Sequence, residues 1–175
     1  NQDPAVIEVL FSLLSSVLSL NIEHSNLSAW KEYISNLGPC MYQLSIKGVN
    51  LFHGSYISDS NILQSIASNC PHICSISLVI DFVSSNIIDA EMTAFAEKCP
   101  QLEELSLTCQ QLTDQSVIAL AQHCSRLKKL ELSKCTLTAA SLIALSERGL
   151  PLEELVIPRI PDSSVKYTPH LCVSG

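Results

Sequence analysis

The chain has 175 residues, of which 47% are hydrophobic and 15% are charged, so we expect one ordered domain, residues 1–175, with a sizeable core. Its net charge is −7, and it has neither a basic stripe nor a basic tail, which disfavours nucleic acid or anionic lipid as a partner. The most apolar stretch, residues 5–20, is interrupted by Glu8 and too short to span a bilayer comfortably, so no membrane insertion is expected.

The first sixteen residues are expected to form an N-terminal helix that either caps the domain or continues its pattern. Asp3 can cap this helix, and Pro4 suits its first position. The chain begins with Asn1 rather than Met, so we expect a trimmed or processed piece of a longer protein. Its start lacks the positively charged leader of a secretory signal.

From residue 17 to residue 157 one short pattern, L-x-x-L-x-L, recurs along the chain. It is clearest as LEELSL, LKKLEL and LEELVI, looser as MYQLSI and ICSISL, and weakest as SSVLSL. The steps between its central apolar positions are 26, 32, 29, 25 and 25 residues, and these positions are Leu18, Leu44, Ile76, Leu105, Leu130 and Leu155. Since apolar and polar residues alternate within each copy, the pattern predicts six half-buried strands.

A segment with helical spacing follows each strand from the second to the fifth. Val117, Leu120 and Ala121, for example, fall on one helical face, and Leu142, Leu145 and Ser146 are placed in the same way. Short polar side chains stand near the expected helix starts, and prolines just past the ends: Ser58, Asp89, Thr113 and Thr138, then Pro71, Pro100 and Pro151. The longer steps contain extra pieces, residues 48–60 and 79–86, which we expect to form loops at one edge.

These units predict an α/β fold. One strand–helix unit cannot bury its own apolar face, whereas stacked copies share a continuous core. We expect a solenoid, an arc of about six parallel strands inside with helices outside, and residues 158–175, with three prolines, as a C-terminal cap or tail.

Eight cysteines invite a disulfide or a metal interpretation. However, Cys70, Cys99 and Cys124 occupy one recurring place, where a free thiol behaves as a small buried hydrophobe. A reducing intracellular setting, cytoplasmic or nuclear, is therefore favoured over a disulfide scaffold. The cluster Cys70, His72 and Cys74 lacks a second ligand pair at a conventional spacing, and Cys74 is expected beside solvent or a loop, so no zinc site is expected.

Catalysis and cofactor binding are not expected either. His123 and Cys124 are neighbours at a helix end, where adjacent side chains rarely face each other. Nothing suggests a catalytic triad, and no glycine-rich phosphate loop follows a strand.

The best-formed unit resembles the cysteine-containing class of leucine-rich repeats, best known from the substrate-recognition halves of F-box proteins in ubiquitin ligases. The matching residues are Cys99, Pro100, Leu102, Leu105, Leu107, Cys109, Leu112, Thr113, Asp114, Val117, Leu120, Ala121 and Cys124. Cys109 stands one residue early for this class, and Ala139 replaces the Asp of the next unit. Residues 4–30 are also faintly similar to an F-box, although Leu18 to Leu20 already fit the first strand.

The resemblance implies a ribonuclease-inhibitor-like fold and a protein–protein interaction module, such as an adaptor or substrate-recognition domain. The partner would bind on the concave sheet face or at the edge loops, within an assembly of the ubiquitin-ligase type. The alternative is a structural or assembly subunit of a larger complex, or a pathogen effector scaffold, again without catalysis.

The polar positions of the strands should point out of the sheet. Those expected to contact a protein partner are Gln43, Ser45, Lys47, Ser75, Ser77, Glu104, Ser106, Thr108, Lys129, Glu131, Ser133 and Glu154. The first strand should place Ser19 beside Ser45. Six strands give a floor about 24 Å wide, which suits a peptide or one helix. Two alternatives are that the serines merely fit a solvated sheet, and that the tail from Pro161 to Gly175 covers the floor.

Overall fold

The computed structural model describes residues 17–23, 34, 36–47, 62–79, 87–158 and 160. The expected N-terminal helix, the extra piece at 48–60, most of the one at 79–86 and nearly all of the tail lie outside these residues. Within them six strands form one sheet: β1 Ser19–Glu23, β2 Gln43–Lys47, β3 Ser75–Val79, β4 Glu104–Thr108, β5 Lys129–Ser133 and β6 Glu154–Val156.

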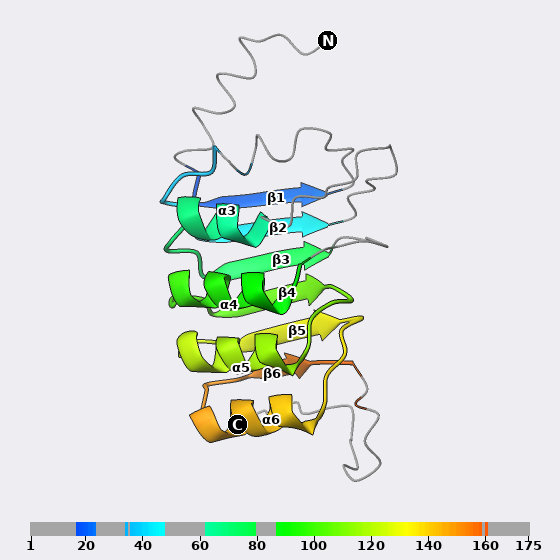
Figure 1. Cartoon of the computed structure of the whole chain (residues 1–175). Helices are drawn as coiled ribbons and strands as arrows, with labels where there is room; N and C mark the ends of the chain where they lie inside the picture. Colours follow the sequence, from blue (N-terminus) through cyan, green and yellow to red (C-terminus); the bar gives the residue numbers. More distant parts are fainter. Residues whose placement is uncertain are drawn as a thin grey trace, which may run out of the picture.

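The sheet is parallel and open. Its strand order, β1-β2-β3-β4-β5-β6, is the order of the chain, and every neighbouring pair is parallel. The helices of the described part lie on one face of the sheet, one beside the next (Figure 1): α3 Ile62–Asn69, α4 Asp89–Lys98, α5 Asp114–His123 and α6 Ala139–Arg148. The chain is therefore an α/β protein with about the number of parallel strands that the repeat pattern predicts.

The core lies between the sheet and the helices. Leu44, Ile76, Leu105 and Leu130 are register partners on successive strands, and each is at most 1% exposed. Helix residues at the predicted spacing, such as Val117, Leu120 and Ala121, pack against them. The expectation for α6 is wrong in one respect, because Leu145 is buried while Ser146 is exposed.

The predicted register of β1 is wrong by two residues. Leu20, and not Leu18, pairs with Leu44, so Ser19 lies beside Gln43. The carbonyl of Leu18 accepts the N–H groups of Tyr42 (2.7 Å) and Gln43 (3.1 Å). The carbonyl of Tyr42 accepts the next such pair, from Cys74 and Ser75, so Leu18 is the counterpart of Tyr42, directly before the strand. Leu18 is consequently 64% exposed instead of lying in the core.

Two of the expected helix caps are confirmed and one is corrected. Thr113 and Thr138 cap α5 and α6, and their hydroxyls accept the backbone N–H two residues on. Asp89 is instead the first residue of α4, whose N-cap, Ile88, makes no side-chain hydrogen bond. Ser58 lies outside the described residues. At its other end, α6 stops at Gly149 in the left-handed region (φ 59°), a conformation that glycine adopts without steric cost.

Candidate protein-binding face

The candidate site is the face of the sheet turned away from the helices, here called the polar face. Because successive strand residues point to opposite sides, the residues between the buried leucines share this face. The strand register arranges eleven of the twelve predicted residues in three columns: Gln43, Ser75, Glu104, Lys129 and Glu154, then Ser45, Ser77, Ser106 and Glu131, then Thr108 and Ser133. Lys47 lies in the third column by its backbone, and its side chain is outside the described part.

The first column is held by polar contacts between neighbouring strands. Ser75 donates its hydroxyl to Glu104 (2.8 Å), and Lys129 forms an ion pair with Glu154 (2.7 Å). At the other end, Ser19 donates to Gln43 (3.5 Å), so it belongs to this column and not to the middle one. These contacts link β1 to β2, β3 to β4 and β5 to β6.

The other two columns link β4 to β5. Ser106 donates its hydroxyl to Glu131 at 3.1 Å, and the hydroxyls of Thr108 and Ser133 are hydrogen-bonded at 2.9 Å. All four side chains are half-buried. Over these strands the polar face therefore presents side chains whose positions are already fixed by their neighbours.

Negative charge predominates on the polar face. The described side chains of the three columns include three carboxylates, of Glu104, Glu131 and Glu154, and one ammonium group, of Lys129. The pKa of Lys129 is raised, mainly by its hydrogen bond to Glu154, with smaller contributions from the other two carboxylates. All three carboxylates thus act electrostatically on Lys129, but its ion pair is with Glu154.

A second charged group lies at the sheet edge where the strands begin. Glu103 forms ion pairs with Arg126 and Lys128, each at 2.7 Å. The hydrogen bond from Lys128 is the main reason why the pKa of Glu103 is lowered. The repeat pattern indicates that Glu103 and Lys128 hold equivalent positions, one step apart, but it does not predict this ion pair.

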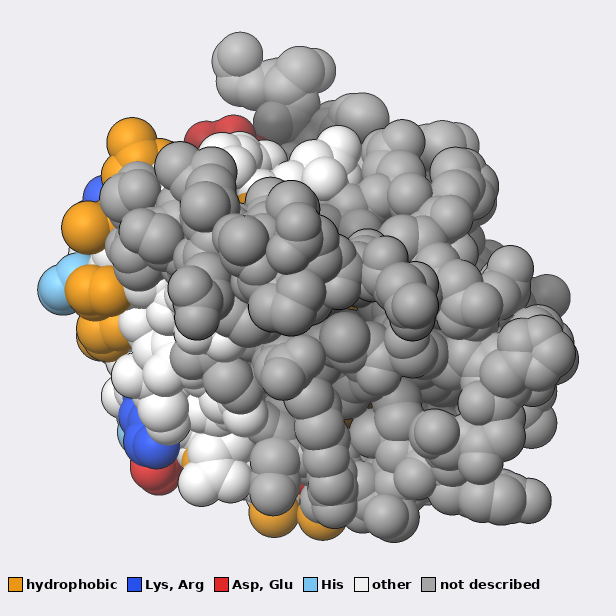
Figure 2. Space-filling view, turned by 90° about the horizontal axis from the view of Figure 1, so that it is seen from above, with side chains coloured by type: hydrophobic (Ala, Val, Ile, Leu, Met, Phe, Trp, Pro, Cys, Tyr) orange, Lys and Arg blue, Asp and Glu red, His pale blue; other side chains and the backbone are white. Residues whose placement is uncertain are grey.

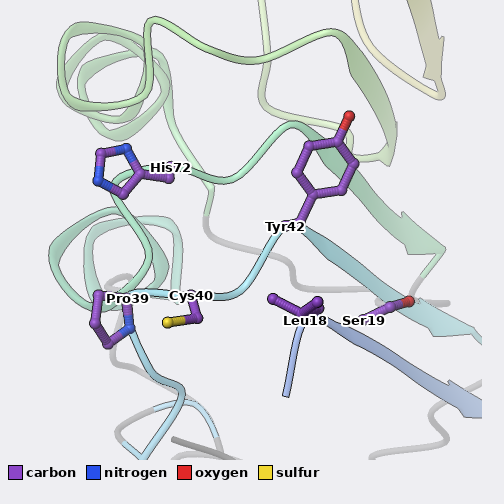
Figure 3. Close-up of a pocket in the computed structure, with 6 residues that line it drawn as sticks. All are labelled: Leu18, Ser19, Pro39, Cys40, Tyr42 and His72. Atoms are coloured by element: carbon purple, nitrogen blue, oxygen red, sulfur yellow. The ribbon is translucent and has the colours of Figure 1, made fainter. Parts of the chain in front are cut away.

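The same edge carries a shallow apolar hollow of about 520 Å³ beside β1 and β2 (Figure 3). It is lined by Leu18, Ser19, Pro39, Cys40, Tyr42 and His72. Figure 2 shows hydrophobic side chains and a histidine gathered on the left, the side on which the strands begin in Figure 1. The sequence does not predict this hollow because its pattern places Leu18 inside the core.

The cysteines that the structure describes carry free thiols. Cys40 is exposed, whereas the other six are buried. Burial raises the pKa of Cys70 to about 11 and that of Cys99 and Cys124 to about 12. The prediction that these three cysteines are buried is confirmed.

The interpretation of CPHIC needs one correction. Cys74 is 8% exposed, so it does not face solvent, and its thiol donates to the carbonyl of His72 (3.4 Å), in the loop before β3. Its pKa is raised, chiefly by burial, and the neighbouring Tyr42 hydroxyl opposes this rise. Among the described residues, no group of three His, Cys, Asp or Glu side chains could hold a metal ion.

No family model matches the chain, and no curated protein is significantly similar to it. The resemblance to cysteine-containing leucine-rich repeats therefore stays a prediction from the residues. Within the part of the chain that the structure describes, none of the helices is long and apolar enough to cross a membrane.

Proposed function

We propose that the chain is a protein-binding scaffold, a leucine-rich-repeat solenoid that serves as an adaptor or substrate-recognition module. The observation that carries this proposal is the polar face. It spans six strands, lies on the side of the sheet opposite the helices of the described part, and bears residues in register from strand to strand. A surface of this kind suits a partner that crosses several strands at once.

Three features of the units support the leucine-rich-repeat assignment. The strands are parallel and follow the chain order. The recurring cysteines are fully buried at the helix ends, as Cys99 and Cys124 illustrate. Thr113 caps its helix and Asp114 follows it, at the positions where this repeat class carries the same residues.

The composition of the polar face supports recognition rather than catalysis as its role. Apart from Val156, its described side chains are polar or charged, and most of them are engaged with each other. Such groups can provide hydrogen bonds and charge to a partner surface.

The free, buried thiols favour a reducing compartment, cytoplasmic or nuclear. The resemblance to cysteine-containing leucine-rich repeats further suggests that the chain works within an assembly of the ubiquitin-ligase type.

The experiment is a comparison of partners captured by two variants. In the first, the charges of Glu104, Lys129 and Glu131 are all reversed. In the second, two exposed glutamates on the helices, Glu97 and Glu147, are changed to lysine. Purified chain and each variant are used to capture proteins from the native source under identical conditions. We expect the first variant alone to lose its specific partners, and unchanged partners on it would falsify binding through the polar face.

An assembly subunit is the second candidate, favoured by the flank of the last unit. Leu152, Leu155 and Ile157 are only partly buried, whereas their counterparts in the units of β2 to β5 are at most 4% exposed. On α6, Ile143 is 56% exposed, while Ile118, at the same place on α5, is half-buried. Replacing Ile143 with Glu should then abolish association in the native complex without unfolding the chain; retained association would remove this candidate.

A further inference from the structure

We infer that the polar face selects a basic partner segment, one that brings an arginine or lysine side chain to Glu104 and Glu131. This inference rests on the proposed function and names the chemistry of the partner. Its starting point is the charge of the polar face, where three carboxylates surround a single described ammonium group.

The contacts leave two of those carboxylates without a cation. Lys129 lies opposite Glu104 in the strand register, yet its ammonium group pairs with Glu154 on the other side, at 2.7 Å. Glu104 accepts one hydrogen bond, from Ser75, and Glu131 accepts one, from Ser106. Each carboxylate has about four lone-pair positions, so both keep capacity for further donors.

The cations nearest along the chain are already engaged elsewhere. Arg126 and Lys128 both bind Glu103 at the edge of the sheet, and Arg126 also donates to Gln101 at 2.6 Å. Neither of these two described cations is thus available to Glu104 or Glu131, and in the inferred complex a partner supplies their cation. A guanidinium group suits this role because it can donate two parallel hydrogen bonds to one carboxylate.

The neighbouring strands leave room for the backbone of such a segment. Over β2 and β3 the middle column consists of Ser45 and Ser77, which are small and half-buried. A segment that crosses this floor meets successive strands about every 4.8 Å, close to the 5.4 Å rise of one helical turn. Its next two turns would reach Glu104 on β4 and then Glu131 on β5.

Charge also selects against the other classes of partner. Nucleic acids and anionic lipid surfaces would meet the uncompensated carboxylates and a chain of net charge −7. A basic protein segment is attracted by the same charges, and its association weakens as salt rises. The polar face therefore fits an Arg- or Lys-bearing peptide rather than a polyanion.

The test uses a phage-displayed library of short random peptides, selected against the folded chain. Binding of the strongest peptides is then measured by calorimetry to the chain and to three variants. E104Q/E131Q removes the two charges, and E97Q/E147Q removes two exposed carboxylates from the helices. S77Y fills the serine floor and leaves every charge in place. Circular dichroism confirms that each variant is folded.

We expect the selected peptides to be rich in Arg and Lys and to bind E104Q/E131Q about tenfold or more weakly, since hydrogen bonds to charged groups are the stronger ones. E97Q/E147Q should bind as the parent chain does. Peptides lost on S77Y but retained on E104Q/E131Q would overturn the basic-partner inference and leave binding through the polar face standing. Peptides indifferent to both variants, or a selection that yields none, would overturn the proposed function as well.

Discussion

The carboxylate of Asp89 accepts two hydrogen bonds from Thr113, one from its backbone N–H (2.9 Å) and one from its hydroxyl (2.6 Å). One unit later, Asp114 binds Thr138 through the same pair of groups, at 2.8 and 2.5 Å. Each threonine is also the N-cap of its own helix. The first residue of one helix thus fixes the start of the next, and the series stops at Ala139, in α6, the last helix of the described part.

Replacing Asp89 with Ala should destabilise the chain by about 1–2 kcal/mol. The change removes both bonds to Thr113 and the acceptor of Ser116, whose side chain is fully buried. Asp114→Ala should cost less, since Ser141 donates to a backbone carbonyl and does not depend on that carboxylate. Urea unfolding measures both, with exposed Glu97→Ala as the control. Equal losses for the two aspartates would contradict this ranking.

The stabilisation from Asp89 should depend on pH. Partial burial opposes ionisation, but the hydrogen bonds from Ser116 and Thr113 outweigh it and lower the pKa of Asp89. In the unfolded chain the pKa of Asp89 is about 3.9. Because its pKa in the folded chain is lower, ionised Asp89 stabilises the folded chain above the unfolded-state pKa. This stabilisation is lost as the pH falls through the folded-state pKa. The difference in unfolding free energy between the parent and D89N should therefore be full near neutral pH and shrink below about pH 4. A difference that grows on acidification would refute this sign.

The thiols should react in an order set by burial. Cys99 and Cys124 are 0% exposed and their pKa is raised to about 12, whereas Cys40 is exposed. Since the thiolate is the reactive form, a brief alkylation pulse near neutral pH should label Cys40 well before the other two. Mass spectrometry of the digested chain measures this order, and the same pulse in denaturant serves as the control. Early labelling of Cys99 in the folded chain would contradict its place in the core.

The repeat pattern predicts most of the fold because the core itself has a repeat. Leu105 and Leu130 stand at the same place in nearly identical units, and only parallel, in-register strands bury both. The same reasoning does not fix β1. A shift of two residues keeps every side chain on its face, so placing Leu18 or Leu20 beside Leu44 satisfies the alternation equally well. The choice is made by the Leu18 carbonyl, which accepts two N–H groups at the start of β2, and a residue pattern does not encode this contact.

The columns of the polar face follow from the strand register, but the side-chain pairs within them do not. The sequence places Glu104 between Ser75 and Lys129, and either neighbour could bind it. In the structure Ser75 donates to Glu104, while Lys129 turns to Glu154. The role of Asp89 was missed for a similar reason. An aspartate near a helix start is usually a cap of that helix, and its true partner lies in the following unit.

The register of β1 can be tested with a pair of matched substitutions. Leu20 packs against the core beside Leu44, so Leu20→Ala should destabilise the chain by about 1–3 kcal/mol, less than a fully buried leucine would cost because Leu20 is only partly buried. Leu18 is 64% exposed, so Leu18→Ala should stay within about 0.5 kcal/mol of the parent. Thermal and urea unfolding measure both variants, and Leu105→Ala, at a fully buried position, marks the upper limit. A larger loss from Leu18→Ala than from Leu20→Ala would restore the register that the repeat pattern predicts and would remove Leu18 from the apolar hollow.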